Sequence, residues 1–175
     1  MNRKTLVAYA SKYGSTAEIA EKIGDVLNQT GLATDVLSAD KVGDLTQYEA
    51  VILGSAVYIG KWRKEAVNFL ISHEKFLAKR HVWLFSSGPS GEGEPVELLD
   101  GWRFPEAQQS VIERISPRGI KVFHGSVDTE KLNFIEKSMI KTVKAPSGDF
   151  RDWDDITLWA ESIAEALKEE SPTTG

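Results

Sequence analysis

Short apolar runs alternate with stretches of helical periodicity along most of this chain. The run at residues 50–55 is continuously apolar and of strand length, which is typical of a parallel strand buried on both faces. Comparable strands are predicted at residues 6–8, 33–37, 82–86 and 120–124. Helical spacing predicts a helix from about residue 17 to Gly31, and further helices at 62–77, 106–115, 130–144 and 154–168. This alternation predicts an α/β fold, a parallel sheet with helices on both faces.

Two segments are longer than this alternation needs. Residues 87–117 open with a stretch rich in glycine, proline and glutamate, and then contain the predicted helix at 106–115. Residues 126–153 hold the predicted helix at 130–144 and a loop at 145–149. Segments of this length in a compact domain usually have a function or are ordered by a ligand.

The connection between the first strand and the first helix carries the most informative chemistry. Its sequence, Tyr-Ala-Ser-Lys-Tyr-Gly-Ser-Thr at residues 9–16, places hydroxyls and a glycine at a helix start. Backbone N–H groups and the positive end of the helix dipole favour a phosphate there, and no cationic side chain is required. A second interpretation is a plain helix cap, because Ser15 and Glu18 have the spacing of a capping box.

Composition narrows the functional classes. The 175 residues suit one domain, predicted over residues 1–170 with a disordered tail at 171–175. A formal net charge of −5 argues against nucleic acid as a partner. With no cysteine, three separated histidines and no apolar run near the ~18 residues of a membrane span, we expect no disulfide, metal site or transmembrane segment. The N-terminus has no signal-peptide core, so we expect a cytoplasmic protein.

Three loops are expected to meet at one edge of the sheet. In an open parallel sheet, ligands bind beyond the carboxyl ends of the strands, where the strand order reverses. The loops that follow strands at this edge are residues 11–16, 55–62 and 86–89. Together they describe a site with a phosphate at one end and a flat apolar ring at the other, with Tyr58 as a stacking surface. The alternative for both residues is packing in the core. For Trp62 this alternative has about the same weight as a role in the site, and for Tyr58 it has less weight.

These loops resemble those of a known family. The stretch at 9–16 is similar to the phosphate loop of flavodoxins, and Gly-Ser-Ala-Val-Tyr-Ile-Gly at 54–60 is similar to their second flavin loop. The whole chain most resembles the flavodoxin-like, menaquinone-dependent protoporphyrinogen oxidases and their flavodoxin-domain relatives. Residues 134–141, 147–149 and 152–153 resemble that family's extra helix, its loop and the start of its last helix.

The resemblance implies a flavodoxin-like three-layer sandwich with a five-stranded parallel sheet in the order 2-1-3-4-5. It also implies non-covalently bound FMN. The residues that would bind it are Ser11, Lys12, Tyr13, Gly14, Ser15, Thr16, Ala56, Val57, Tyr58, Ile59, Gly60, Ser87, Gly88 and Pro89. By this resemblance Ser11, Tyr13, Gly14, Ser15 and Thr16 would hold the phosphate, and residues 56–60 and 87–89 would flank the isoalloxazine.

Other phosphate-binding classes do not fit this loop. A P-loop needs Gly-Lys-Ser/Thr, a low-molecular-weight phosphatase needs a cysteine, and a phospho-receiver domain needs aspartates at the strand ends. Two functions remain open. One is an FMN oxidoreductase that acts on a quinone and a porphyrinogen, and the other is an electron carrier that docks on a redox partner protein. Neither requires a catalytic acid or base, since the flavin carries the electron chemistry.

The predicted helix at 130–144 bears on the location of the protein. Lys137, Lys141 and Lys144 recur at helical spacing, as they would in an interfacial helix on anionic lipid. The same spacing also suits a solvated helix face, which is the more common case. Peripheral contact with the inner face of a membrane and the oligomeric state are both left open by the sequence.

Overall fold

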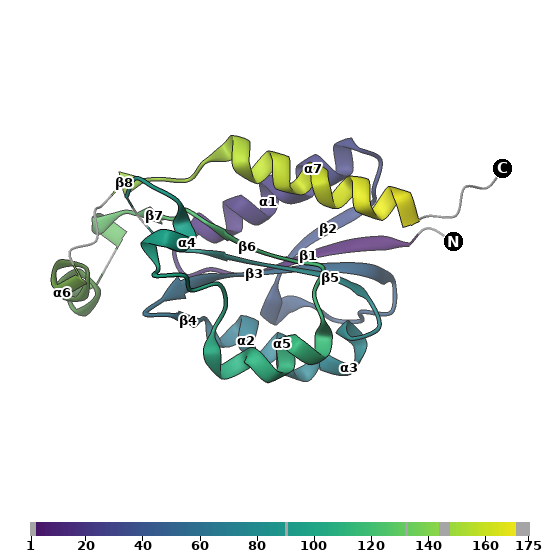
Figure 1. Ribbon diagram of the computed structural model, residues 1–175, viewed down its shortest axis with the longest axis horizontal. Helices are drawn as coiled ribbons and strands as arrows, with labels where there is room; N and C mark the ends of the chain where they lie inside the picture. Colours follow the sequence, from purple (N-terminus) through teal and green to yellow (C-terminus); the bar gives the residue numbers. More distant parts are fainter. Residues whose placement is uncertain (1–2, 90, 132, 144–147, 171–175) are drawn as a thin grey trace.

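The computed structural model describes residues 3–89, 91–131, 133–143 and 148–170, and its core is a five-stranded parallel sheet (Figure 1). Its strand order is β2-β1-β3-β5-β6, which is 2-1-3-4-5 when only these strands are counted. The strands are β1 (Lys4–Ala10), β2 (Thr34–Ser38), β3 (Tyr48–Tyr58), β5 (His81–Ser87) and β6 (Gly119–Phe123). The predicted α/β fold and strand order are confirmed, while the predicted tail at 171–175 lies outside the described residues.

Helices cover both faces of this sheet, as the periodicity predicts. On one face lie α1 (Ser15–Gln29) and α7 (Trp153–Glu170), and on the other lie α2 (Lys64–Ser72), α3 (Glu74–Leu77) and α5 (Gln109–Ile115) (Figure 1). Three rings join α7 to the sheet: Phe85, Phe123 and Trp159 contact one another edge to face, with centroids 5.5–6.0 Å apart. Such contacts add to the burial of these large apolar side chains.

The start of α1 differs from the capping-box interpretation. Gly14, with a φ of 89°, is the residue before the helix, and no side chain caps the helix there. Ser15 therefore lies inside the first turn, and the carboxylate of Glu18 pairs with Arg151 instead of turning back to the helix start. The capping box is wrong because the backbone of Gly14 makes the turn that a capping serine would make. The helix ends as predicted, at Thr30 followed by Gly31 with a φ of 92°.

The third strand runs further than predicted. It continues past residue 55 to Tyr58 and folds back as an antiparallel hairpin onto β4 (Lys61–Trp62). Ile59 and Gly60 form the turn, and both have positive φ, as the twist of a tight hairpin requires. The helix predicted at 62–77 is correspondingly shorter, and it is divided into α2 and α3 at His73.

The two long segments contain short elements. The first includes α4 (Pro95–Leu98) and η2 (Glu106–Gln108) before α5, and a further 3-10 turn, η1 (Ala39–Lys41), follows β2. The second includes η3 (Thr129–Lys131) and α6 (Phe134–Val143) between two short strands, β7 (Ser126–Val127) and β8 (Gly148–Asp149), which pair antiparallel. The helix predicted at 130–144 is thus confirmed only over α6, and residues 144–147 lie outside the described part.

Candidate functional site

A cavity of about 620 Å³ opens at the carboxyl edge of the sheet. The loops after β1, β3 and β5 line it, together with residues from the segment 125–136 and Arg151. Ten of the fourteen residues predicted from the sequence lie on its wall: Ser11, Lys12, Tyr13, Ser15, Thr16, Ala56, Val57, Tyr58, Ser87 and Gly88. The sheet edge therefore brings the three predicted loops to one cavity.

The other four predicted residues lie behind or beside the wall. Gly14 forms the turn before α1, and Ile59 and Gly60 form the tip of the β3–β4 hairpin. Pro89 is buried, and its carbonyl oxygen accepts a hydrogen bond from the N–H of Gly125 at 2.9 Å. A Cβ on Gly125 would approach the backbone of Gly88 to 2.9 Å, so the loops after β5 and β6 pack as closely as two glycines allow.

One end of the cavity has the features of an anion site. The N-terminus of α1 faces it, and the first N–H groups of a helix have no acceptor within the helix. The Ser11 hydroxyl accepts a hydrogen bond from the N–H of Gly14 at 3.0 Å, which fixes the loop. The Ser15 hydroxyl is buried and has no hydrogen-bond partner among the described residues. A buried hydroxyl without a partner is costly, so this end suits a ligand that accepts hydrogen bonds.

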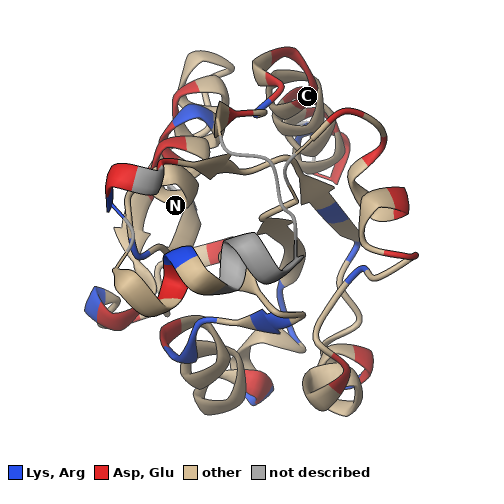
Figure 2. Cartoon of the chain, turned by 90° about the vertical axis from the view of Figure 1, so that its left-hand side faces the viewer, with Lys and Arg blue, Asp and Glu red and all other residues tan. Residues whose placement is uncertain are grey.

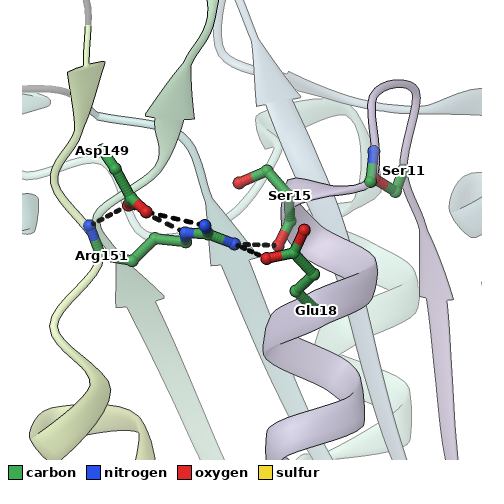
Figure 3. Close-up of polar contacts among 6 residues, drawn as sticks. Ser11, Ser15, Glu18, Asp149 and Arg151 are labelled. Carbon is green, nitrogen blue, oxygen red and sulfur yellow. Dashed lines mark hydrogen bonds and ion pairs between the residues drawn. The ribbon is translucent and has the colours of Figure 1, made fainter.

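Arg151 adds a positive charge beside this end (Figure 3). Its side chain is only 9% exposed, and its guanidinium donates hydrogen bonds to both carboxylate oxygens of Asp149, at 2.9 and 2.8 Å. It also donates to the Glu18 carboxylate at 2.8 Å and to the Ser15 carbonyl oxygen at 3.2 Å. The hydrogen bonds from Arg151 hold the pKa of Asp149 below its usual value.

A second ion pair joins α6 to the loop after β1. The buried carboxylate of Glu136 accepts hydrogen bonds from the Lys12 ammonium at 2.8 Å and from the Tyr13 hydroxyl. Burial of Glu136 opposes its ionisation, but its hydrogen bonds outweigh this effect and hold its pKa below the usual value. The bond to Glu136 in turn raises the pKa of Lys12. Figure 2 shows α6 crossing this end of the molecule, with both acidic and basic residues along the ribbon around it.

The other end of the cavity is more apolar. Val57 and Tyr58 end β3 there, and Tyr58 is 41% exposed, so it belongs to the wall and not to the core. Trp62 contacts the cavity but is 6% exposed, and its indole N–H donates to the Ser86 hydroxyl at 2.8 Å. Core packing is therefore the correct interpretation for Trp62.

Several wall residues were missed by sequence reasoning. They are Glu18, Lys61, Arg63, Gly125, Ser126, Val127, Asp128, Lys131, Asn133, Ile135, Glu136 and Arg151. Most belong to the segment 126–153, whose length indicated a function without indicating which side chains turn toward the cavity.

No helix in the described part of the chain is long and apolar enough to span a membrane.

A doubly wound parallel sheet with a cavity at its strand-order reversal defines the class of α/β proteins that bind ligands beyond the carboxyl ends of their strands. Within this class, the family model described as "Flavodoxin domain" matches residues 6–154, so the chain belongs to the flavodoxin-domain family. The resemblance seen in the two loops is thereby confirmed at the level of the family.

Individual relatives are distant. Protoporphyrinogen IX dehydrogenase (quinone) of Escherichia coli strain K12 is 21% identical over 179 residues, covering 92% of this chain and 94% of that protein. A flavodoxin from the domain Archaea superposes with a TM-score of 0.62 and 18% identity, over 94% of this chain and 99% of that one. Oxidised Flavodoxin 2 from Bacillus cereus superposes with a TM-score of 0.58 and 22% identity, over 94% of this chain and 99% of that one. The two structures establish the shared fold.

Proposed function

We propose that this protein is one FMN-binding domain over residues 1–170, and that it acts as an oxidoreductase of the protoporphyrinogen-oxidase type that passes electrons to a quinone. The observation that carries FMN binding is the buried Ser15 hydroxyl at the N-terminus of α1, which has no hydrogen-bond partner among the described residues and lies in a cavity whose far end is more apolar. FMN supplies the electron-transfer chemistry when bound. A phosphate would satisfy the Ser15 hydroxyl and the free N–H groups of the helix, whereas riboflavin would leave them without partners.

The residues present fit this cofactor in charge, polarity and size. Ser11, Ser15 and Thr16 offer hydroxyls at the helix start, and residues 56–60 and 87–89 would flank the ring. The cavity volume of about 620 Å³ falls within the ~300–1,000 Å³ that is usual for small-molecule sites. In this proposal Tyr58 orients the ring by stacking, and the buried wall excludes water from its other side.

The segment 126–151 supports an enzyme that handles its own substrate. Val127, Asp128 and Ile135 line the cavity beyond the three flavin loops. Walls of this kind orient a small molecule and limit access of water, which benefits catalysis. The relation to the E. coli dehydrogenase over most of both chains supports the same proposal, with a porphyrinogen as electron donor and a quinone as acceptor.

An electron carrier is the second candidate. Tyr58 and Ile59, 41% and 66% exposed, form an apolar rim at the cavity mouth that could meet a redox partner protein. A related proposal is peripheral contact with a membrane, because Phe134 and Ile135 at the start of α6 are also exposed and Lys137 lies beside them. Lys144 lies outside the described residues, and the side chain of Lys141 is not described.

The test begins with cofactor binding. The purified protein is expected to be yellow, or to become so with FMN, and to bind FMN more tightly than riboflavin. Equal affinity for the two flavins would rule out a phosphate site at α1.

The second stage separates enzyme from carrier. The loaded protein is assayed for porphyrinogen oxidation with a menaquinone analogue, beside a variant in which a short Gly/Ser loop replaces residues 128–147. We expect turnover in the intact protein, and its loss in the variant while FMN stays bound. Absence of turnover in the intact protein, with rapid electron exchange with a redox partner protein, would contradict the enzyme proposal.

A further inference from the structure

Arg151 connects the phosphate end of the cavity to a segment outside the three flavin loops. It lies two residues after β8, yet it contacts the first turn of α1 at Ser15 and Glu18, across more than 130 positions of the chain. It is also the most buried cationic side chain on the cavity wall: Lys12 is 44% exposed, Arg63 28% and Arg151 9%, while Lys61 and Lys131 are exposed. Its charge is therefore the least screened by solvent on that wall.

The charges around this end would be unfavourable to phosphate without Arg151. Glu18 and Asp149 place two carboxylates beside the N-terminus of α1, and each would repel a phosphate dianion. The single guanidinium between them neutralises part of this charge and holds both carboxylates against itself (Figure 3). Lys12 does not replace it, because its ammonium pairs with Glu136.

Arg151 also fixes the backbone of the residue that carries the unpartnered hydroxyl. Its Nη1 donates to the Ser15 carbonyl oxygen, while the Ser15 hydroxyl is buried without a partner in the described part of the chain. Figure 3 shows this hydroxyl directed away from α1. A guanidinium can hold a carboxylate through two atoms and a carbonyl oxygen through a third, whereas a lysine ammonium is a single point charge.

We propose that Arg151 is a positioning residue for the phosphate end, which presents the Ser15 hydroxyl to a phosphate monoester and masks the charges of Glu18 and Asp149. This rests on the proposed FMN binding. Arg151 thereby contributes to the discrimination between FMN and riboflavin. It does so from the same segment that forms the outer wall of the cavity, so one stretch of chain contributes both to the phosphate end and to that wall.

The experiment compares dissociation constants for FMN and riboflavin in wild type, Arg151→Met, Arg151→Lys and Glu18→Gln, measured by quenching of flavin fluorescence. We expect Arg151→Met to weaken FMN by roughly ten- to a hundredfold, as for a lost charge-assisted interaction, and riboflavin by less than about twofold. Arg151→Lys should recover only part of the loss. Glu18→Gln, which removes a repelling charge and leaves the Asp149 pair in place, should tighten FMN and leave riboflavin unchanged.

Other outcomes would overturn the inference. If Arg151→Met weakens both flavins equally, or lowers only the melting temperature, Arg151 is a structural tie. Unchanged FMN affinity in Glu18→Gln would remove the charge argument. Should wild type bind neither flavin, the proposed function fails, and the melting temperature is then followed with inorganic phosphate. If phosphate raises the melting temperature of wild type but not of Arg151→Met, the role of Arg151 at the phosphate end is still supported. If phosphate raises the melting temperature of neither protein, the inference is overturned.

Discussion

The Glu136 carboxylate on α6 receives a hydrogen bond from the Lys12 ammonium at 2.8 Å, so residues 124 positions apart meet over the phosphate loop. The Tyr13 hydroxyl donates to the same carboxylate oxygen. This contact ties α6 to the loop after β1 through an ionised carboxylate.

Glu136→Gln should therefore loosen α6 without disturbing the sheet. Because hydrogen bonds hold the pKa of this carboxyl below its usual value, the tie is present above about pH 4.3, the unperturbed value, and is lost as the pH falls through the lower folded pKa. Hydrogen exchange at pH 6–7 should show faster exchange in α6 of Glu136→Gln and unchanged exchange in β1 and β3. Exchange that is equal in both proteins would show that the apolar contacts of α6 suffice.

Ser15→Ala offers a clean test of the helix start. The Ser15 hydroxyl is buried without a partner in the described structure, so its removal should leave the ligand-free protein at least as stable, with a gain of up to about 1–3 kcal/mol. FMN should lose about 1.5–3 kcal/mol of binding free energy if the phosphate takes this hydroxyl. Titration calorimetry and thermal melts measure the two effects.

The double variant Ser11→Ala with Thr16→Ala tests the rest of the loop. Ser11 fixes Gly14 and Thr16 is 1% exposed, so some loss of stability is expected beside a larger loss of FMN affinity. Early melting of the ligand-free protein together with normal FMN binding would assign these hydroxyls to the fold alone.

Tyr58 and Trp62 should behave differently although both touch the cavity. Tyr58→Ala should leave the fold intact and shift the absorption spectrum and reduction potentials of bound flavin, because Tyr58 is a wall residue. Trp62→Ala should cost about 3–5 kcal/mol of stability, because its ring is buried and its indole N–H is bonded to Ser86. An unchanged flavin spectrum in folded Tyr58→Ala would remove Tyr58 from the ring site.

Gly54 should not tolerate even a methyl group. An ideal Cβ there would lie 2.0 Å from Cζ of Phe85 across the sheet, so Gly54→Ala should destabilise the fold by about 1–3 kcal/mol through overpacking. Gly43→Ala is the matched control, since a Cβ at that position has nothing within 4 Å. In urea melts, Phe85→Leu should cost less in the Gly54→Ala background than alone, and strict additivity would contradict the clash.

Tyr48 should ionise well above the ordinary pKa of a tyrosine. Burial, and then its 2.7 Å hydrogen bond to Asp35, raise its pKa to about 12. A raised pKa means that the stabilisation is complete below about pH 10 and is lost as the pH rises toward 12. Absorbance at alkaline pH should show a tyrosine that ionises late, and Asp35→Asn should lower its pKa but not to the normal value, because burial remains. A normal titration of all tyrosines in the folded protein would contradict this.

The sequence predicts the sheet well because its signals are local. Residues 50–55 are apolar throughout, and a strand buried on both faces needs nothing more. The hairpin at 58–62 escaped prediction because Ile59 adopts a positive φ that its residue type does not indicate. The helical spacing that follows then extended the predicted helix back to Trp62, which the structure assigns to β4.

The site is predictable in part for the same reason. Hydroxyls between a strand and a helix identify the phosphate end without any knowledge of distant residues. Arg151 and Glu136 could not be found in this way, because their partners Ser15 and Lys12 are more than 120 positions away. Only the path of the segment from β7 to the start of α7 brings them to the loop, and no periodicity encodes that path.

The pairing of β7 with β8 has a kinetic consequence. These two strands pair with each other and form a sheet separate from the main one. The ends of the intervening segment are therefore held together, so no further loop closure is needed when that segment reorders. We expect α6 to open and close as a cooperative unit of its own, at a lower free energy than global unfolding. We expect a ligand to exchange through that local opening, without unfolding of the main sheet.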